Sequence, residues 1–211
     1  MNSQPTRWAI FIPNSMRKIL TLLIFSFSLL TLQAQSLKDL FLKMPQEVCP
    51  VLSEYNRLEI VDNQKNDKTM QTRNLFRTFS KMEELTDDYA HLVISKNSEK
   101  EMKMLAKKDG TRIIMVISTI FCDDTPDSSV AFYSTDWKPL STLDYYTLPR
   151  IDNFRHVTVD KVTNQLTVTT TNAPFVLQME GNNETKKAYS STNTFRWSTE
   201  ESRYILEESK N

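Results

Sequence analysis

The chain has 211 residues, of which 26 are basic and 26 acidic, and only two are histidine, two cysteine and two glycine. Such a balanced charge argues against a nucleic-acid-binding protein, which would show a basic surface or a high isoelectric point. Two glycines are too few for a phosphate-binding glycine loop, a dinucleotide fingerprint or the G-x-S-x-G turn of α/β-hydrolases, so these enzyme classes are excluded and no cofactor is predicted.

The N-terminal segment has the pattern of a secretory signal. Arg17 and Lys18 precede an uncharged, largely apolar run over residues 19–32, and Ala34 follows as a small residue. A basic region, an apolar run of about 7–15 residues and a small residue before the cut are what the export machinery recognises. A membrane-spanning helix would need about 20 apolar residues. We therefore predict cleavage after Ala34, a periplasmic or secreted location, and no stable membrane anchor after cleavage.

The predicted mature chain, residues 35–211, has the size of one globular domain. It is long enough to fold without disulfides or metals. Residues 1–15 can be an extension from a misassigned start, because Met16 stands directly before the basic pair. Cys49 and Cys122 would lie in an oxidising compartment, where they either form one disulfide or stay two separate buried thiols. The sequence leaves both alternatives open.

Two amphipathic helices are expected at the start of the mature chain. Ser36-Leu37-Lys38-Asp39 has the spacing of a capping box with Asp in place of Glu. Apolar residues then follow at helical spacing, at Leu37, Leu40, Phe41 and Met44. Pro45 and Pro50 interrupt this helix. A second helix is expected from near Pro50, with one apolar face formed by Val51, Leu52, Tyr55, Leu58 and Val61.

Strand patterns follow a polar connector that is expected over residues 63–74. Three strands are predicted, at residues 89–95, 99–106 and 112–121. Asp109-Gly110 suits a tight hairpin between the last two. Residues 113–117 are all apolar, so we place them in a central strand that is covered on both faces. A fourth strand is expected at residues 129–134, after a loop that contains Asp123, Asp124, Pro126 and Asp127.

The second half of the chain is predicted to be rich in strands. A hairpin is indicated around residues 161–165 by the alternating apolar residues Val157, Val159, Leu166 and Val168. Further strands are expected at residues 175–179, 194–198 and 204–206. Residues 140–154 are expected to form a long ordered loop or one short helix. The predicted fold is therefore α+β: an N-terminal amphipathic helix pair packed on antiparallel sheet, with a β-rich C-terminal half.

Residues that could carry nucleophilic or metal chemistry are scattered along the chain. The histidines His91 and His156 form no H-x-x-x-H pair, and a zinc site with both cysteines would need four distant segments to converge. No metal site is predicted for this reason. A Cys-His nucleophilic pair stays open, because such partners are usually distant in sequence.

Two acidic runs offer carboxylates, one in the loop with Asp123, Asp124 and Asp127 and the other at residues 83–88. Carboxylates can bind calcium or, in pairs, hydrolyse a glycosidic bond. The spacing of the first run matches no known calcium loop. Solvated turns are the simpler interpretation of both runs.

Five aromatic residues crowd into one stretch and form the candidate binding site: Tyr133, Trp137, Tyr145, Tyr146 and Phe154. Exposed aromatic side chains stack on sugars or anchor a protein partner, whereas most large aromatics lie in the core. We expect Trp137 to be the exposed member, because it stands between Asp136 and Lys138 where the preceding strand ends.

Three stretches resemble one known family. They are Met44-Pro45-Gln46-Glu47-Val48-Cys49-Pro50-Val51-Leu52 running into Asn56-Arg57-Leu58, then Glu84-Leu85-Thr86-Asp87-Asp88-Tyr89, and then Val130-Ala131-Phe132-Tyr133-Ser134-Thr135-Asp136-Trp137-Lys138-Pro139-Leu140. Together they resemble an uncharacterised family of exported proteins, a domain of unknown function, from Bacteroides-like bacteria. The resemblance spans most of the mature chain. It implies a Gram-negative envelope location and carries over no catalytic residues.

The leading functional hypothesis is a non-enzymatic envelope or secreted protein that binds a protein or glycan of the cell envelope. Export, the absence of catalytic signatures and the aromatic stretch favour it. One alternative is a periplasmic hydrolase that uses carboxylates or a Cys-His pair. Another is an inhibitor or accessory subunit of an exported enzyme, which a helix-plus-sheet fold does not by itself establish.

Overall fold

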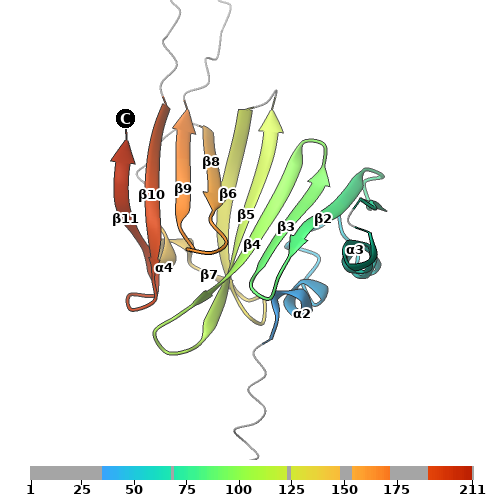
Figure 1. The fold of residues 1–211 in the computed structure, drawn as a ribbon, viewed down its shortest axis with the longest axis horizontal. Helices are drawn as coiled ribbons and strands as arrows, with labels where there is room; N and C mark the ends of the chain where they lie inside the picture. The colour runs from blue at the N-terminus through green and yellow to red at the C-terminus, as the bar shows by residue number, and fades with distance from the viewer. Residues whose placement is uncertain (1–34, 68, 123–124, 148–153, 172–189, 211) are drawn as a thin grey trace, which may run out of the picture. The chain divides into compact units, whose positions relative to one another are not determined.

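The computed structural model describes residues 35–67, 69–122, 125–147, 154–171 and 190–210 (Figure 1). The predicted signal segment at residues 1–34 and the predicted strand at residues 175–179 lie outside the described residues, so both stay predictions. All helices and strands below belong to one unit, Ser36–Asn211, which we call the second unit because residues 1–35 precede it. No helix in the described part is long and apolar enough to cross a membrane.

Two helices open the second unit, and serine caps both. Helix α2 (Leu37–Leu42) begins after Ser36, whose hydroxyl accepts a hydrogen bond from the Asp39 amide as predicted. Helix α3 (Glu54–Asn66) begins after Ser53, which forms a complete capping box with Asn56. Both caps satisfy backbone amides that would otherwise lack a partner at the helix start.

Helix α3 buries a different face from the predicted one, apart from Val61, which is buried as predicted. Its buried residues are Asn56, Arg57, Ile60 and Val61. Tyr55 and Leu58, which were expected on the apolar face, are exposed. The physical reason is that the Ser53 cap starts the helix after Val51 and Leu52, so these two residues do not define its face. The guanidinium of Arg57 instead turns inward and donates hydrogen bonds to the carbonyl oxygens of Leu42 and Leu52.

Seven strands form an antiparallel sheet in chain order. They are β1 (Thr72–Arg73), β2 (Phe79–Leu85), β3 (Tyr89–Ser95), β4 (Ser98–Ala106), β5 (Arg112–Cys122), β6 (Thr125–Ser134) and β7 (Pro139–Leu140). The strands predicted at residues 89–95, 99–106 and 112–121 correspond to β3, β4 and β5. Gly110 has a φ of 79° in the turn between β4 and β5, which a side chain would disfavour. The connector expected over residues 63–74 is wrong at both ends, because α3 and β1 occupy them.

The remaining strands form a second antiparallel sheet. These are β8 (Phe154–Val159), β9 (Leu166–Thr171), β10 (Ser190–Ser198) and β11 (Arg203–Lys210), in the spatial order β11-β10-β9-β8. The predicted hairpin around residues 161–165 joins β8 to β9. Helix α4 (Thr142–Tyr145) confirms the short-helix alternative for residues 140–154. Strand β8 lies beside β6, so β8 is the strand through which the second sheet contacts the first (Figure 1).

Strand β5 lies between two hydrophobic cores, because successive side chains of a strand point to opposite faces. Ile114 and Val116 pack with the helices in the first core. Ile113, Met115 and Ile117 pack in the second core with residues of the C-terminal sheet such as Val157 and Val168. The predicted central strand, covered on both faces, is therefore confirmed. The α+β fold, with a helix pair on antiparallel sheet and a β-rich second half, is confirmed as well.

Candidate functional site

The five aromatic candidates are divided between the two cores and their edges. Tyr133 and Trp137 pack against each other beside the first core, with ring centroids 5.6 Å apart. Tyr145 and Tyr146 pack in the second core, where Tyr146 meets the rings of Phe195 and Tyr204 edge to face. Phe154 is half-buried at the start of β8. The stretch therefore does not present its aromatics on one exposed surface.

The expectation that Trp137 is exposed is wrong. Its side chain is only 6% exposed, and the indole Nε1 donates a hydrogen bond to the carbonyl oxygen of Leu40 at 2.9 Å. The cause lies in the turn between β6 and β7, where Trp137 adopts a φ of 61° and its amide donates to the carbonyl of Ser134. This left-handed conformation turns the ring back towards helix α2.

The two cysteines are free thiols, so the disulfide alternative is not formed in the structure. The alternative of two separate buried thiols holds for Cys49, which is buried in the first core, but is wrong for Cys122, which is exposed at the end of β5. His91 on β3 contacts Glu99 at 3.1 Å. Its neighbour Leu92 faces the core that holds Cys49, so His91 points to the opposite face of the sheet. The sheet therefore separates Cys49 from His91.

The acidic loop predicted before β6 is only partly described. Asp123 and Asp124 lie outside the described residues. Asp127 belongs to β6, and its Oδ1 accepts a hydrogen bond from the backbone amide of Arg155 at 3.4 Å. Among the residues that the structure describes, no three His, Cys, Asp or Glu side chains are arranged to hold a metal ion.

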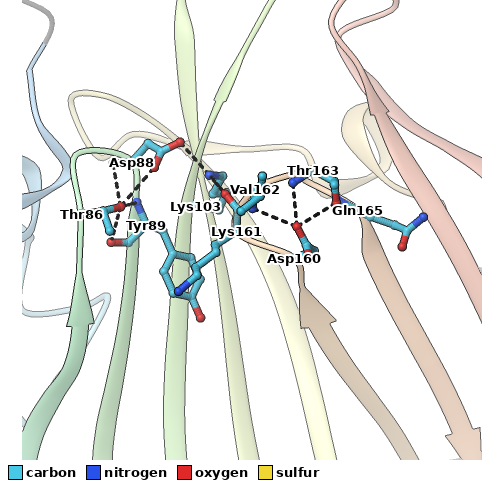
Figure 2. Close-up of polar contacts among 9 residues, drawn as sticks. All are labelled: Thr86, Asp88, Tyr89, Lys103, Asp160, Lys161, Val162, Thr163 and Gln165. Atoms are coloured by element: carbon cyan, nitrogen blue, oxygen red, sulfur yellow. Dashed lines mark hydrogen bonds and ion pairs between the residues drawn. The ribbon is translucent and has the colours of Figure 1, made fainter.

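A charged network joins the two sheets on the face that carries His91, and Figure 2 shows its centre. The side chain of Lys103 on β4 is 1% exposed. Its Nζ donates hydrogen bonds to Asp88 Oδ2 at 2.7 Å and to the carbonyl oxygen of Lys161 at 2.6 Å. The carboxylate of Asp160 accepts two backbone amides of the same turn and fixes its shape. Because a buried charge is costly unless it is paired, Lys103 holds the β8–β9 turn against the first sheet.

Three further pairs extend this network across β2, β3 and β4. They are Lys161 Nζ with Glu84 Oε1 at 2.5 Å, Tyr89 OH with Glu101 Oε2 at 2.8 Å, and His91 Nε2 with Glu99 Oε2 at 3.1 Å. Burial raises the pKa of Glu101, although the hydrogen bond from Tyr89 lowers it. Burial and then the charge of Glu101 raise the pKa of Tyr89. The carboxylates of Glu84, Asp88, Glu99 and Glu101 each bind a side chain of this network. We therefore interpret the network as structural.

Glu101 is expected to make stability depend on pH. Because its pKa is raised on folding, the stability that it contributes is complete below its ordinary pKa of 4.5 and is lost as the pH rises through the folded value. Glu101→Gln stays neutral and can still accept the Tyr89 hydrogen bond. We therefore expect its stability relative to the wild type to improve from pH 4 to pH 8 in urea unfolding. Glu200→Gln, at an exposed glutamate, is the matched control. If the free energy of unfolding of Glu101→Gln differs from that of the wild type by the same amount at pH 4 and pH 8, the burial of Glu101 does not affect stability.

A second candidate site is an exposed apolar surface at the start of α3 and in the hairpin between β1 and β2. Four large apolar side chains there are between 47% and 72% exposed, and we call them the α3–hairpin surface: Tyr55, Leu58, Leu75 and Phe76. Several hydrogen bonds join the segments. The Leu75 amide donates to the Val51 carbonyl at 3.0 Å, and the Asn56 side chain donates to the Arg73 carbonyl at 3.1 Å.

The local structure holds this surface in place. Tyr55 and Leu58 lie three residues apart on α3, so they share one side of the helix. The hairpin turn is built by Asn74, which is buried: its Oδ1 accepts the amides of Phe76 and Thr78, and its Nδ2 donates to side chains of the hairpin and to the Ile94 carbonyl. A turn fixed by so many bonds presents its apolar side chains to solvent in one arrangement.

The two helices, the seven-stranded sheet and the four-stranded sheet define an α+β fold that a solved structure shares. A domain of an uncharacterised protein from Porphyromonas gingivalis W83 is similar over 81% of this chain and 97% of that domain, with a TM-score of 0.63 and 18% sequence identity. That likeness concerns the fold alone. The family model described as a protein of unknown function, DUF3256, matches residues 29–208, and the chain belongs to this family. No curated protein matches the sequence.

Family membership confirms that the chain belongs to a domain family of unknown function, as the three sequence stretches indicated. The envelope location that the resemblance implied stays a prediction.

Proposed function

We propose that the chain is an exported, non-enzymatic protein of the bacterial envelope that binds a protein partner through the α3–hairpin surface. The observation that carries this proposal is the grouping of four exposed, large apolar side chains on a helix start and on a hairpin that is hydrogen-bonded to it. Exposed apolar patches mark interaction sites. Aromatic anchors supply much of the binding energy of protein interfaces, and two of the four side chains are aromatic.

A protein is favoured over a glycan because of the chemistry of the surface. Sugars are held by hydrogen bonds to their hydroxyls together with aromatic stacking, and polar groups fix their orientation. Only Tyr55, among the four side chains, carries a polar group. A partner with its own apolar patch fits this surface better.

Export is the second part of the proposal, and the N-terminal sequence supports it. Removal of a signal at Ala34 would leave a chain that starts at residue 35, shortly before the cap of α2. The mass of the intact protein isolated from the envelope of its native cells is expected to equal that of residues 35–211. A protein that retains residues 19–32, or that fractionates with the cytosol, would contradict export without affecting the surface.

Serine substitutions test the surface itself. Tyr55→Ser combined with Phe76→Ser is expected to lower the recovery of the bound partner from envelope extracts more than tenfold, because a hot-spot side chain contributes about 2 kcal/mol and 1.4 kcal/mol is a factor of ten. The matched control is Leu143→Ser combined with Val162→Ser, two exposed apolar residues elsewhere. Both double variants should keep the wild-type fold by circular dichroism. Equal recovery with the two variants would refute the proposed surface, and binding on a glycan array would assign the surface to the other partner class.

A further inference from the structure

The outer face of helix α3 combines apolar and acidic side chains. Four residues at positions i, i+3, i+4 and i+7 share this face, opposite the residues that the helix buries: Tyr55, Leu58, Glu59 and Asp62. Tyr55 is 72% exposed and Leu58 47% exposed, and Asp62 is exposed as well. The outer face therefore offers a partner two apolar side chains and two carboxylates along two turns of helix.

The tip of the β1–β2 hairpin adds two apolar side chains and a positive charge. Leu75, Phe76 and Arg77 are exposed there. The Leu75 amide donates to the carbonyl oxygen of Val51, two residues before the Ser53 cap. The tip therefore lies beside the start of α3.

The charges of the two segments have opposite signs. Arg77 of the hairpin, and Glu59 and Asp62 of the helix, form no ion pair with any residue that the structure describes. A partner that complements this surface must offer an apolar patch, an acidic group opposite Arg77 and a basic group opposite the outer face of α3. A second copy of the same surface offers all three.

We propose that the α3–hairpin surface binds a second copy of this chain, an inference that rests on the proposed function and names its partner. In a two-fold dimer both copies use the same surface, so each contact occurs twice. Two α3 helices that pack antiparallel about Leu58 bring the two Leu58 side chains together. Tyr55 of each copy then lies beside Asp62 of the other copy, because these residues precede and follow Leu58 by about one helical turn.

The same arrangement brings each hairpin tip to the second half of the other α3. Arg77 there meets Asp62 of the other copy, and its guanidinium pairs with the carboxylate. A parallel arrangement of the two helices would instead bring the two Arg77 side chains together, and like charges that face each other across an interface are unfavourable. The charges of this surface therefore favour the antiparallel dimer.

Sedimentation velocity of the protein purified from its native cells tests the dimer, and we expect twice the mass of one chain. Arg77→Glu and Asp62→Arg should each raise the dissociation constant about tenfold or more, because each places like charges opposite one another. The double variant exchanges the two charges and should restore the dimer. Lys138→Glu, at an exposed lysine after Trp137, is the matched control and should dimerise as the wild type does.

Two results would overturn self-association through this surface. One is a protein that is monomeric at every concentration, and the other is a dimer that both single variants leave intact. A double variant that keeps the wild-type circular dichroism but stays monomeric would overturn the antiparallel arrangement. None of these results decides the proposed function, because a photoreactive residue at position 76 that forms an adduct with a different envelope protein would still show a binding surface.

Discussion

Trp137→Ala is expected to lower the free energy of unfolding by about 3–5 kcal/mol, the usual cost of removing a large buried aromatic side chain. The indole fills the space between the β6–β7 turn and helix α2, and it supplies the hydrogen bond to the Leu40 carbonyl. Its loss would leave a cavity and an unpaired carbonyl at the end of α2. Urea unfolding followed by circular dichroism measures the change.

Trp137→Phe separates the two contributions. It keeps most of the apolar contact and removes the indole N–H, so we expect a smaller cost that includes about 1–3 kcal/mol for the unpaired buried carbonyl. A cost below about 1 kcal/mol for Trp137→Ala, the mean effect of an ordinary substitution, would show that this residue does not pin the helix to the sheet.

Asp88→Ala is expected to destabilise the protein more than Lys103→Met, although the two residues form one ion pair. Removing Asp88 leaves the buried ammonium of Lys103 without its counter-charge, which costs about 3 kcal/mol or more. Lys103→Met removes the charge itself and keeps a side chain of similar length, so its expected cost is about 1 kcal/mol or less. The double variant should be close to Lys103→Met alone.

These variants form a double-mutant cycle on the ion pair of Asp88 with Lys103, which joins the β2–β3 turn to β4. Urea unfolding of the two single variants and of the double variant provides all its terms. If Lys103→Met costs more than Asp88→Ala, or if the two costs simply add, the buried ammonium of Lys103 does not depend on the exposed carboxylate of Asp88 as its counter-charge.

The sequence predicts the central sheet well because its signals are local there. Strands β3 and β5 are rich in apolar residues, β4 carries them in its second half, and Gly110 marks the turn between β4 and β5. Strand β2 escapes prediction because three of its seven residues are charged. Contacts with β3 and helix α3 hold β2 in the sheet. The sequence of β2 itself does not indicate these contacts.

The face of α3 shows why a helical pattern needs its starting residue. Val51, Leu52 and Tyr55 match a helical stripe, but the Ser53 cap excludes the first two from the helix. The inward face then includes Arg57, whose donors serve two carbonyls of neighbouring segments. Such a use of a charged residue depends on tertiary contacts that are not visible in the local sequence.

The charged network and the burial of Trp137 could not be predicted from the sequence, for different reasons. Lys103 is 15 residues from Asp88 and 58 from Lys161, so only the pairing of strands and sheets brings them together. Its position between Met102 and Met104 in a strand was the one available hint of a buried charge. Trp137 stands among polar residues, which suggests exposure, and only the left-handed turn conformation shows that the ring points inward.

Site-specific photo-cross-linking in native cells examines the α3–hairpin surface most directly. A photoreactive amino acid is placed at Phe76 in one variant and at Val162, an exposed residue of the β8–β9 turn, in the other. We expect position 76 to form a discrete adduct with one envelope protein and position 162 to form none. No adduct at position 76, or the same adducts at both positions, would contradict a protein-binding role for this surface.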